Sequence, residues 1–250
     1  EAGLGFADLD VFVHGTTLAT NAVIERKGAK TALIATDGFR DVIEIADEGR
    51  YDQYDIFIDK PRQLVPRQLR FTVPERIDVM GKVWVDLDEA AVRKVAKALK
   101  AEKVEAVAVA FIHSYANGAH EQRVRDILAR EAPGIAVTLS SEVCPEMREY
   151  ERTSTAVANA YVQPLMAGYL GRLKARFAAE GYGKPIHLMT SGGSLATLET
   201  AARFPIRLVE SGPAGGAILA AYIAAERGED KVLSFDMGGT TAKICLIHDA

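Results

Sequence analysis

The sequence predicts an α/β fold built on a largely parallel or mixed sheet. Short apolar runs alternate with segments of helical spacing along most of the 250 residues. Residues 106–112 (AVAVAFI) form a continuous apolar run, as expected for a central strand covered on both faces. Residues 88–102 place Val92, Val95 and Leu99 on one helical face and basic residues on the other. This alternation indicates helices packed on the faces of a sheet.

In the first half, we expect strands at residues 10–14 and 31–35, separated by a helix over 20–26 that ends at Gly28 as its C-cap. Residues 37–70 show weak periodicity and two prolines, which indicates a long loop or insertion with room for one short helix. Two further apolar runs, 69–73 and 82–85, are expected to pair as a hairpin.

The second half repeats the alternation more clearly. Helices are expected over 119–130 and 217–225, and strands over 135–140 and 185–190. Residues 153–180 are typical of one long helix, or of two helices joined at a kink at Pro164. A short apolar run at 207–209 and a strand at 232–235 complete the pattern.

Composition excludes several classes of function. Hydrophobic residues make up 48% and charged residues 26%, as in ordinary packed proteins. A net charge of −4 with both signs intermixed gives no basic surface for nucleic acid. No apolar run is long enough to cross a membrane, and no signal peptide is visible. The two cysteines, Cys144 and Cys245, have no CxxC partner, which favours a reducing, cytoplasmic location.

Four turns rich in glycine and hydroxyl residues are expected at the carboxyl ends of strands, the edge where α/β sheets bind ligands. None matches the GxxxxGK[ST] pattern or a GxGxxG pattern with a distal acid, so a P-loop and a dinucleotide fold are disfavoured. The turns are His14–Thr17 (HGTT), Ser191–Ser194 (SGGS), Ser211–Gly216 (SGPAGG) and Asp236–Thr241 (DMGGTT).

The last turn carries the residues best suited to phosphate. Its backbone N–H groups can approach an anion at the glycines, hydroxyls add donors, and Asp236 can hold a metal ion or orient water. The alternative is a tight hairpin turn, with residues 243–247 as the returning strand and Asp236 as a turn acid. The remaining candidates in this turn are Gly238, Gly239, Thr240 and Thr241.

The first turn offers Thr16 and Thr17 as hydroxyl donors to a nucleotide or substrate. Asn21 either joins them or only caps the following helix. His14, just before the turn, is a candidate base or ligand, and the alternative is a hydrogen-bonded structural histidine.

The third turn begins a helix, whose N–H groups favour an anion, although close helix packing would also explain its small residues. Its candidates are Ser211, Gly212, Gly215 and Gly216. Two other groups rank lower. His113, His120 and Glu121 are close in sequence, but a strand end and a helix start separate them, which disfavours a metal site. The tyrosine- and acid-rich residues 47–59 are expected to form a solvated loop.

Six segments resemble the A subunit of the hydantoinase/oxoprolinase family, which is related to the acetone carboxylase β subunit. They follow the family's order and cover most of the chain. They are residues 14–28 (HGTTLATNAVIERKG), 31–45 (TALIATDGFRDVIEI), 149–164 (EYERTSTAVANAYVQP), 191–194 (SGGS), 210–217 (ESGPAGGA) and 234–243 (SFDMGGTTAK).

The resemblance implies an actin/hexokinase/Hsp70-like ATPase fold, which holds ATP between two related domains with two phosphate loops. Residues 236–241 resemble the second loop. The first loop is expected upstream of His14 and the adenosine-binding segment downstream of Ala250, so the chain resembles the middle of a larger subunit, inactive in isolation. Residues 1–150 would then belong to the family's N-terminal domain, and 151–250 would begin its catalytic domain.

The activity that the resemblance implies is ATP- and Mg²⁺-dependent hydrolysis of a cyclic amide, such as a hydantoin or 5-oxoproline. ATP phosphorylates the amide oxygen, and a B-type subunit or domain shares the ring opening, so an oligomer is expected. Two alternatives stay open. One is the β subunit of an ATP-dependent ketone carboxylase, and the other is a nucleotide-dependent interaction protein.

Overall fold

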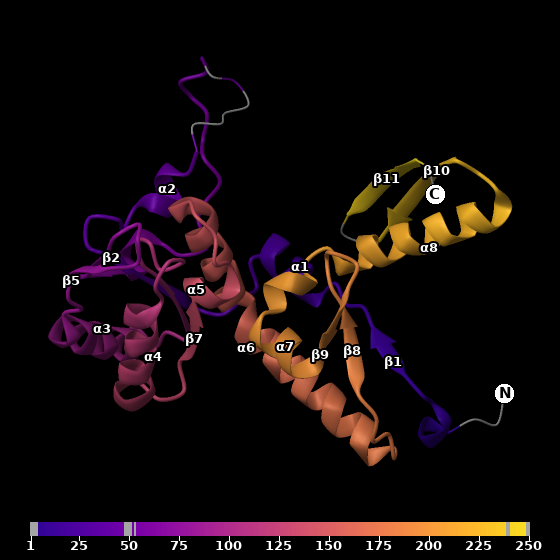
Figure 1. Cartoon of the computed structure of the whole chain (residues 1–250), viewed down its shortest axis with the longest axis horizontal. Helices are drawn as coiled ribbons and strands as arrows, with labels where there is room; N and C mark the ends of the chain where they lie inside the picture. Colours follow the sequence, from indigo (N-terminus) through magenta and orange to yellow (C-terminus); the bar gives the residue numbers. More distant parts are fainter. Residues whose placement is uncertain (1–4, 48–51, 53, 239–240, 249–250) are drawn as a thin grey trace. The chain divides into compact units, whose positions relative to one another are not determined.

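The chain forms two compact units, seen in a computed structural model that describes residues 5–47, 52, 54–238 and 241–248 (Figure 1). The sheet unit comprises residues 28–164, and the hairpin unit comprises residues 1–27 together with 165–250. The long helix α6 (Glu149–Ala179) contributes to both units and contains Pro164 in its interior. The two units are defined by contacts within the fold and do not test the domain boundary at residue 150. That boundary stays a prediction from the sequence.

A four-stranded parallel sheet forms the core of the sheet unit, in the order β3-β2-β6-β7. All six residues of β2 (Thr31–Thr36) and all five of β6 (Ala106–Ala110) are buried. Strands β3 (Arg70–Val73) and β7 (Ala136–Leu139) flank them. The continuous apolar run therefore forms a central strand, and the predicted α/β class is confirmed.

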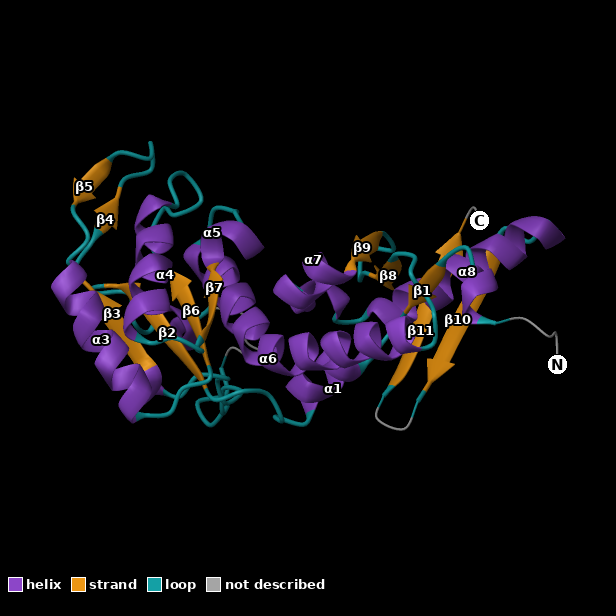
Figure 2. Cartoon of the chain, turned by 90° about the horizontal axis from the view of Figure 1, so that it is seen from below, coloured by secondary structure: helices purple, strands orange, loops and turns teal. Residues whose placement is uncertain are grey.

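Two amphipathic helices, α3 (Glu89–Ala101) and α4 (Ala119–Glu131), pack side by side against this sheet (Figures 1 and 2). Helix α3 buries Val92, Val95 and Leu99, as its spacing predicts. Its N-cap is Asp88, whose carboxylate accepts the Ala91 N–H at 2.9 Å. The short helix α5 (Ser140–Val143) follows β7 directly.

The predicted hairpin between residues 69–73 and 82–85 is wrong. Strand β3 instead pairs in parallel with β2, and β5 (Val83–Val85) pairs with the two-residue strand β4 (Arg76–Ile77). The physical reason is burial: β3 completes the core sheet, whereas all three residues of β5 are exposed.

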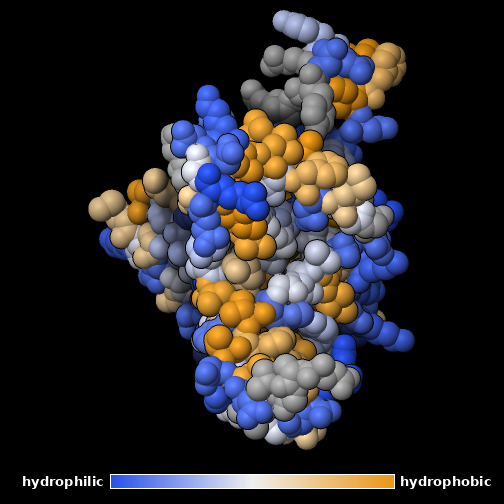
Figure 3. All heavy atoms as spheres, turned by 90° about the vertical axis from the view of Figure 1, so that its right-hand side faces the viewer, coloured by the Kyte–Doolittle hydropathy of each residue, from blue (hydrophilic) through white to orange (hydrophobic). Residues whose placement is uncertain are grey.

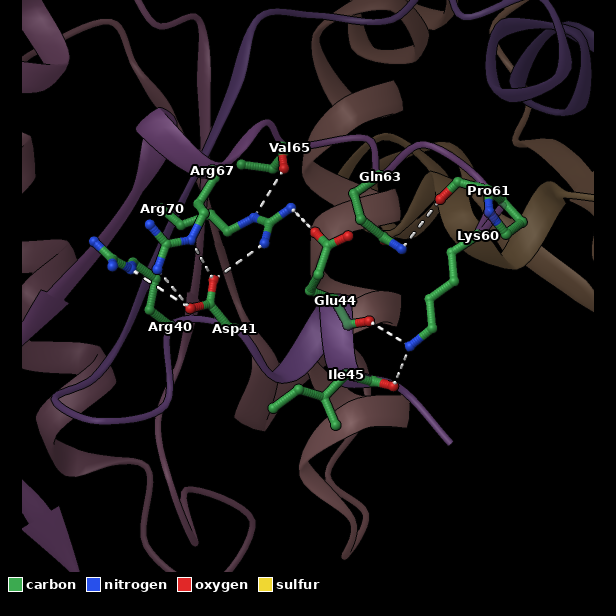
Figure 4. A network of polar contacts seen from close by, with 10 residues as sticks. All are labelled: Arg40, Asp41, Glu44, Ile45, Lys60, Pro61, Gln63, Val65, Arg67 and Arg70. Carbon is green, nitrogen blue, oxygen red and sulfur yellow. Dashed lines mark hydrogen bonds and ion pairs between the residues drawn. The ribbon is translucent and has the colours of Figure 1, made fainter. Parts of the chain in front are cut away.

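Among the described residues between β2 and β3, the only regular elements are the short helices α2 (Val42–Ile45) and η2 (Arg67–Leu69), as expected for a long loop. A polar network ties its two ends together (Figure 4). Buried Arg70 bonds Glu44 at 2.7 Å and the carbonyl of Val65 at 3.0 Å, and Arg67 bonds both oxygens of Asp41. The exposed Tyr54 and Phe57 therefore lie in a loop whose two ends are held together by this network.

The hairpin unit contains a three-stranded sheet, β1-β8-β9, and a separate two-stranded hairpin, β10-β11. In the first sheet, β1 runs parallel to β8 and β9 runs antiparallel to β8. The bounds are β1 Phe12–His14, β8 Ile186–Met189, β9 Leu195–Thr197, β10 Lys231–Met237 and β11 Ala242–His248. The helices are η1 Phe6–Asp8, α1 Leu18–Ile24, α7 Leu198–Arg203, η3 Pro205–Leu208 and α8 Ser211–Arg227.

Gly28 is not the C-cap that its position suggests. Helix α1 ends at Ile24 with Glu25 as its cap, and Arg26 takes the left-handed conformation with φ 57°. Gly28 faces the ring of Tyr161 instead: a Cβ at this position would lie 2.2 Å from a ring carbon. Glycine is therefore required here by close packing.

One face of the β10–β11 hairpin exposes large apolar side chains. The strand register pairs Leu233 with Leu246 and Phe235 with Ile244 on that face, and each of the four is more than half exposed. Apolar residues are visible on the side of the molecule shown in Figure 3. Helix α8 packs on the hairpin, so the opposite face of the hairpin contacts α8 within this unit. Among the described residues, no helix is long and apolar enough to cross a membrane.

Candidate functional site

The glycine- and hydroxyl-rich turns of the hairpin unit lie around the N-terminal half of helix α8. The Ser211 hydroxyl at the start of α8 lies 3.5 Å from the carbonyl of Thr16, and a Cβ on Gly212 would lie 3.7 Å from the methyl group of Thr17. Further along α8, Ile218 covers Gly193 of the SGGS turn. Segments 14–17, 191–194 and 211–216 are thus brought together around one helix, although 195 residues separate Thr16 from Ser211.

Three of the four turns lie at the carboxyl end of a strand, as predicted, and the SGPAGG turn does not. The SGGS turn connects the antiparallel strands β8 and β9, and the DMGGTT turn connects β10 to β11. The SGPAGG segment follows the 3₁₀ helix η3 (Pro205–Leu208) instead of a strand, because Pro205 favours the start of a helical turn. Only the HGTT turn runs from a strand into a helix as expected.

Glu210 connects the remaining turn to this group. Its N–H donates to the Thr20 hydroxyl on α1 at 3.1 Å, and its carboxylate forms an ion pair with Lys243 on β11. Glu210 adopts φ 67°, a left-handed conformation that is costly for a residue other than glycine. The backbone before α8 is therefore held in a strained conformation where α1, α8 and β11 meet.

The N-terminus of α8 has the properties of an anion site. The helix has 17 residues, and no side-chain hydrogen bond caps its first turn. Unpaired N–H groups and the helix dipole favour negative charge at such an end. Close packing, the alternative explanation for the small residues, does not require glycine here. A Cβ on Gly212 or Gly215 would make only ordinary contact with Thr17 or Met189, and one on Gly216 would meet nothing within 4 Å.

The DMGGTT turn closes the β10–β11 hairpin. Asp236 is exposed at the end of β10, directly opposite Lys243 in the register, and the N–H of Gly238 donates to the carbonyl of Thr241 at 3.0 Å. The turn is therefore a hairpin turn, as in the alternative interpretation, and Asp236 and Gly238 are both exposed to solvent. Gly239 and Thr240 lie outside the described residues.

The threonines of the HGTT turn make local contacts at the start of α1. Thr16 accepts the N–H of Leu18 through its hydroxyl at 3.2 Å, and the side-chain amide of Asn21 donates to the Thr17 hydroxyl at 3.4 Å. Both hydroxyls retain hydrogens to donate. Asn21 therefore orients Thr17 from one turn further along the helix.

His14 has a partner that the sequence did not indicate. Its Nε2 lies 2.6 Å from the Tyr169 hydroxyl on α6, and both side chains are partly buried. Burial lowers the pKa of His14 below its usual 6.5, so the ring is neutral at neutral pH. Tyr169 lies 155 residues later in the long helix α6, and nothing in the sequence around it indicates this contact.

The histidines of the sheet unit belong to a different cluster. His120 bonds the buried carboxylate of Glu75 at 2.9 Å, and Glu121 accepts the N–H of Phe111 at 2.9 Å. His113 instead faces the edge of Tyr115. Within the described part of the chain, no group of three His, Cys, Asp or Glu residues can hold a metal ion. His113, His120 and Glu121 therefore make separate contacts and do not form one site.

A cavity of about 400 Å³ lies beside the SGGS turn in the hairpin unit. Hydroxyl residues and one arginine, Arg207, contribute to its lining. Two contacts hold the turn in place. Thr190 and Ser194 bond through their hydroxyls at 2.9 Å, and Ser191 donates its N–H to the carbonyl of Arg207 at 2.8 Å.

Comparison with known proteins fits this arrangement of motifs. The family model described as "Hydantoinase/oxoprolinase N-terminal region" matches residues 2–132, and the one described as "Hydantoinase/oxoprolinase" matches residues 152–250. The chain belongs to the hydantoinase/oxoprolinase family. The resemblance inferred from the six segments is thereby confirmed.

Two characterised relatives are amide-hydrolysing enzymes by name. The caprolactamase α subunit of Pseudomonas jessenii is 38% identical over 96% of this chain and 35% of its own length. The 5-oxoprolinase of Saccharomyces cerevisiae is 32% identical over 94% of this chain and 20% of its own length.

Two solved structures share the fold. Nucleotide-free acetone carboxylase aligns with a TM-score of 0.89 at 29% identity over 98% of this chain and 36% of that chain. The ATP-dependent caprolactamase from P. jessenii aligns with a TM-score of 0.84 at 37% identity over 96% and 35%. The expected fold class, mixed α/β of the actin/hexokinase-like type, is confirmed. The chain spans about a third of the length of the caprolactamase and acetone carboxylase chains that it matches.

Proposed function

We propose that this family member takes part in the ATP-dependent hydrolysis of a cyclic amide, and that the turns around α8 bind the nucleotide phosphates. The observation that carries the proposal is the link through Glu210. It joins the helix N-terminus, the HGTT helix and the DMGGTT hairpin at one place. Relatives with this activity by name, caprolactamase and 5-oxoprolinase, support the choice of reaction.

Each part of this arrangement suits one need of phosphoryl transfer. The N–H groups in the first turn of α8 would donate to phosphate oxygens, where negative charge accumulates during transfer. Thr16, Thr17 and Thr241 would add hydroxyl donors. Transfer of the γ-phosphoryl group to the amide oxygen converts a poor electrophile into one that water can attack.

Mg²⁺ fits the residues present under one condition. Mg²⁺ is commonly held by one or two carboxylates together with substrate phosphates and water, so a single exposed Asp236 is enough if the nucleotide supplies the other ligands. Bound there, the ion would neutralise charge between the β- and γ-phosphates.

A partner subunit and a cytoplasmic location complete the proposal. The relatives include a caprolactamase α subunit and an acetone carboxylase β subunit, both components of complexes by name. We propose a B-type subunit or domain that shares the ring opening.

The test uses the complete subunit, co-expressed with its B-type partner, and measures ADP formation. We expect stimulation by caprolactam, 5-oxoproline or hydantoin. Stimulation by acetone with bicarbonate alone would instead support the ketone carboxylase alternative, which the likeness to acetone carboxylase favours. ADP formation that ignores every small substrate would support a nucleotide-dependent interaction protein.

A further inference from the structure

The contact between His14 and Tyr169 has the properties of a built acid–base pair. A phenol oxygen lies 2.6 Å from Nε2 of a histidine, and the two rings are tilted by 34° with centroids 5.9 Å apart. Tyr169 projects from α6 and His14 ends β1, both within the hairpin unit. Phe12 lies beside the imidazole on the same strand, with ring centroids 6.2 Å apart, which restricts the ring further.

The position of the pair connects it to the proposed phosphate site. His14 is the first residue of the HGTT turn, and the carbonyl of Thr16 in the same turn meets the Ser211 hydroxyl at the N-terminus of α8. Strand β1 is an edge strand that pairs in parallel with β8, in a register that sets His14 beside Leu188, so the His14 backbone is held along one side. The imidazole is thus held on a rigid element, two residues from a group that faces the anion site.

Phosphorylation of an amide oxygen requires a proton acceptor. When the oxygen attacks the γ-phosphorus, the P–O bond to ADP breaks and a new O–P bond forms. As the O–P bond forms, the nitrogen lone pair forms C=N, and the nitrogen becomes positively charged and acidic. Loss of its proton returns the N–H electron pair to nitrogen as a lone pair, which gives an O-phosphorylated imidate with a neutral nitrogen. Without a base, the intermediate would keep a positive charge on nitrogen.

We propose that His14 accepts this N–H proton at Nδ1, and that Tyr169 is the positioning residue that keeps Nδ1 free. In this arrangement the Nε2–H donates to the phenol oxygen of Tyr169, which selects the tautomer with a lone pair on Nδ1. The proposal rests on the proposed function and adds the base, its tautomer and a requirement on the substrate. The cyclic amide must carry a hydrogen on the nitrogen next to the phosphorylated carbonyl.

The imidazole must also be neutral to act as a base. Burial of His14 favours the neutral form. Among the described residues, the titratable group in hydrogen-bond contact with the ring is Tyr169 from α6, and no charged side chain bonds the imidazole. The other described partners, Phe12 and Leu188, are apolar. The pair is therefore ready to take up a proton near neutral pH.

The experiment compares substrate-dependent ADP formation by the complete complex for wild type, His14→Gln and Tyr169→Phe across pH. We expect His14→Gln to lower kcat about 100-fold or more, the usual effect of losing a general base. Tyr169→Phe should lower kcat about 10-fold with little change in KM. The acidic limb of the kcat–pH profile of this variant should move to lower pH. The phenol oxygen of Tyr169 stabilises the imidazolium more than the neutral ring, so its removal lowers the pKa of His14.

Tyr182→Phe is the matched control. Tyr182 also donates its hydroxyl, to the carbonyl of Pro185 at 3.1 Å in the same unit, but it does not contact His14 in any described interaction. It should leave the pH profile unchanged. A Tyr169→Phe enzyme with wild-type kcat and pH profile, even with a lowered melting temperature, would show a purely structural contact and overturn the proposal.

The substrate requirement gives an independent readout. N-Methylcaprolactam has no N–H, so it should fail to stimulate ADP formation where caprolactam does. Equal stimulation by the two lactams would overturn the role of His14 while leaving the proposed function intact. If no cyclic amide of either kind stimulates the wild type, the proposed function fails, and this role of His14 fails with it.

Discussion

Glu210 and Lys243 form an ion pair that joins the segment before α8 to strand β11. The two residues are 33 positions apart, and each follows or precedes a glycine-rich turn. Because Glu210 also bonds Thr20 and adopts a left-handed backbone conformation, three segments of the proposed phosphate site depend on it.

We expect Glu210→Gln to raise the KM for ATP of the complete complex several-fold while the melting temperature changes little. The pair is partly exposed, and such pairs contribute about 0.2–1 kcal/mol to stability. Steady-state kinetics and thermal unfolding check the two effects. The surface pair Lys174–Glu199 provides a control, since Glu199→Gln should alter neither quantity. An unchanged KM for ATP would mean that the ion pair has no part in nucleotide binding.

Asp236→Ala in the complete complex should abolish ADP formation with the fold retained. The carboxylate is exposed at the end of β10, so its removal leaves no cavity, whereas the proposed metal and water contacts are lost. ADP release and circular dichroism measure the two outcomes. Asp230→Ala, one residue before the same strand, is the control and should keep its activity. Near-wild-type ADP formation by Asp236→Ala would show that Asp236 is only a turn acid.

The sequence was sufficient for the elements whose pattern reflects burial. The apolar run of β6 and the amphipathic helix α3 were predicted because a buried strand and a half-buried helix impose different periods. The motif turns were also located from local chemistry, since glycine and hydroxyl residues keep the same preferences in any context. What connects the turns was not predictable, because Glu210–Lys243 and His14–Tyr169 are contacts between distant segments.

The errors have a common physical origin. The strands β3 and β5 look alike in sequence, and only the buried place beside β2 decides which one joins the sheet. Gly28 has the local context of a helix C-cap, but the ring of Tyr161, 133 residues away, requires its missing side chain. In each case a tertiary contact overrides a local preference.

Gly28→Ala should destabilise the protein by about 1–3 kcal/mol, the usual cost of overpacking. The added Cβ would lie within 2.6 Å of three atoms of the Tyr161 ring, so ring or backbone must move. Urea unfolding measures the change. Gly171→Ala is the matched control, since Gly171 lies inside α6 with nothing within 4 Å of the added Cβ. This change should stabilise the helix by about 0.5–1 kcal/mol. If both variants shift stability alike, the Tyr161 contact is not tight.

The last prediction concerns Glu75, a buried carboxylate that no sequence motif marks. It bonds the Thr36 hydroxyl and His120, and its side chain is fully buried. Burial raises its pKa above the usual 4.5, against the opposing effect of these hydrogen bonds. A raised folded-state pKa contributes stability that is fully present below 4.5 and is lost as the pH rises through the folded value.

Glu75→Gln removes this titration, so the free energy of unfolding of the wild type should fall relative to the variant as the pH rises from 4.5 to 8. Other carboxylates titrate in both proteins, and their contribution cancels in the difference. Urea unfolding at several pH values gives this difference directly. Below pH 4.5 the variant should be less stable than the wild type, because the amide is a poorer match for the bonds with Thr36 and His120, and this deficit should shrink as the pH rises. A difference that is the same at pH 4.5 and pH 8 would show that the carboxylate has its ordinary pKa, and that its burial is fully compensated by Thr36 and His120.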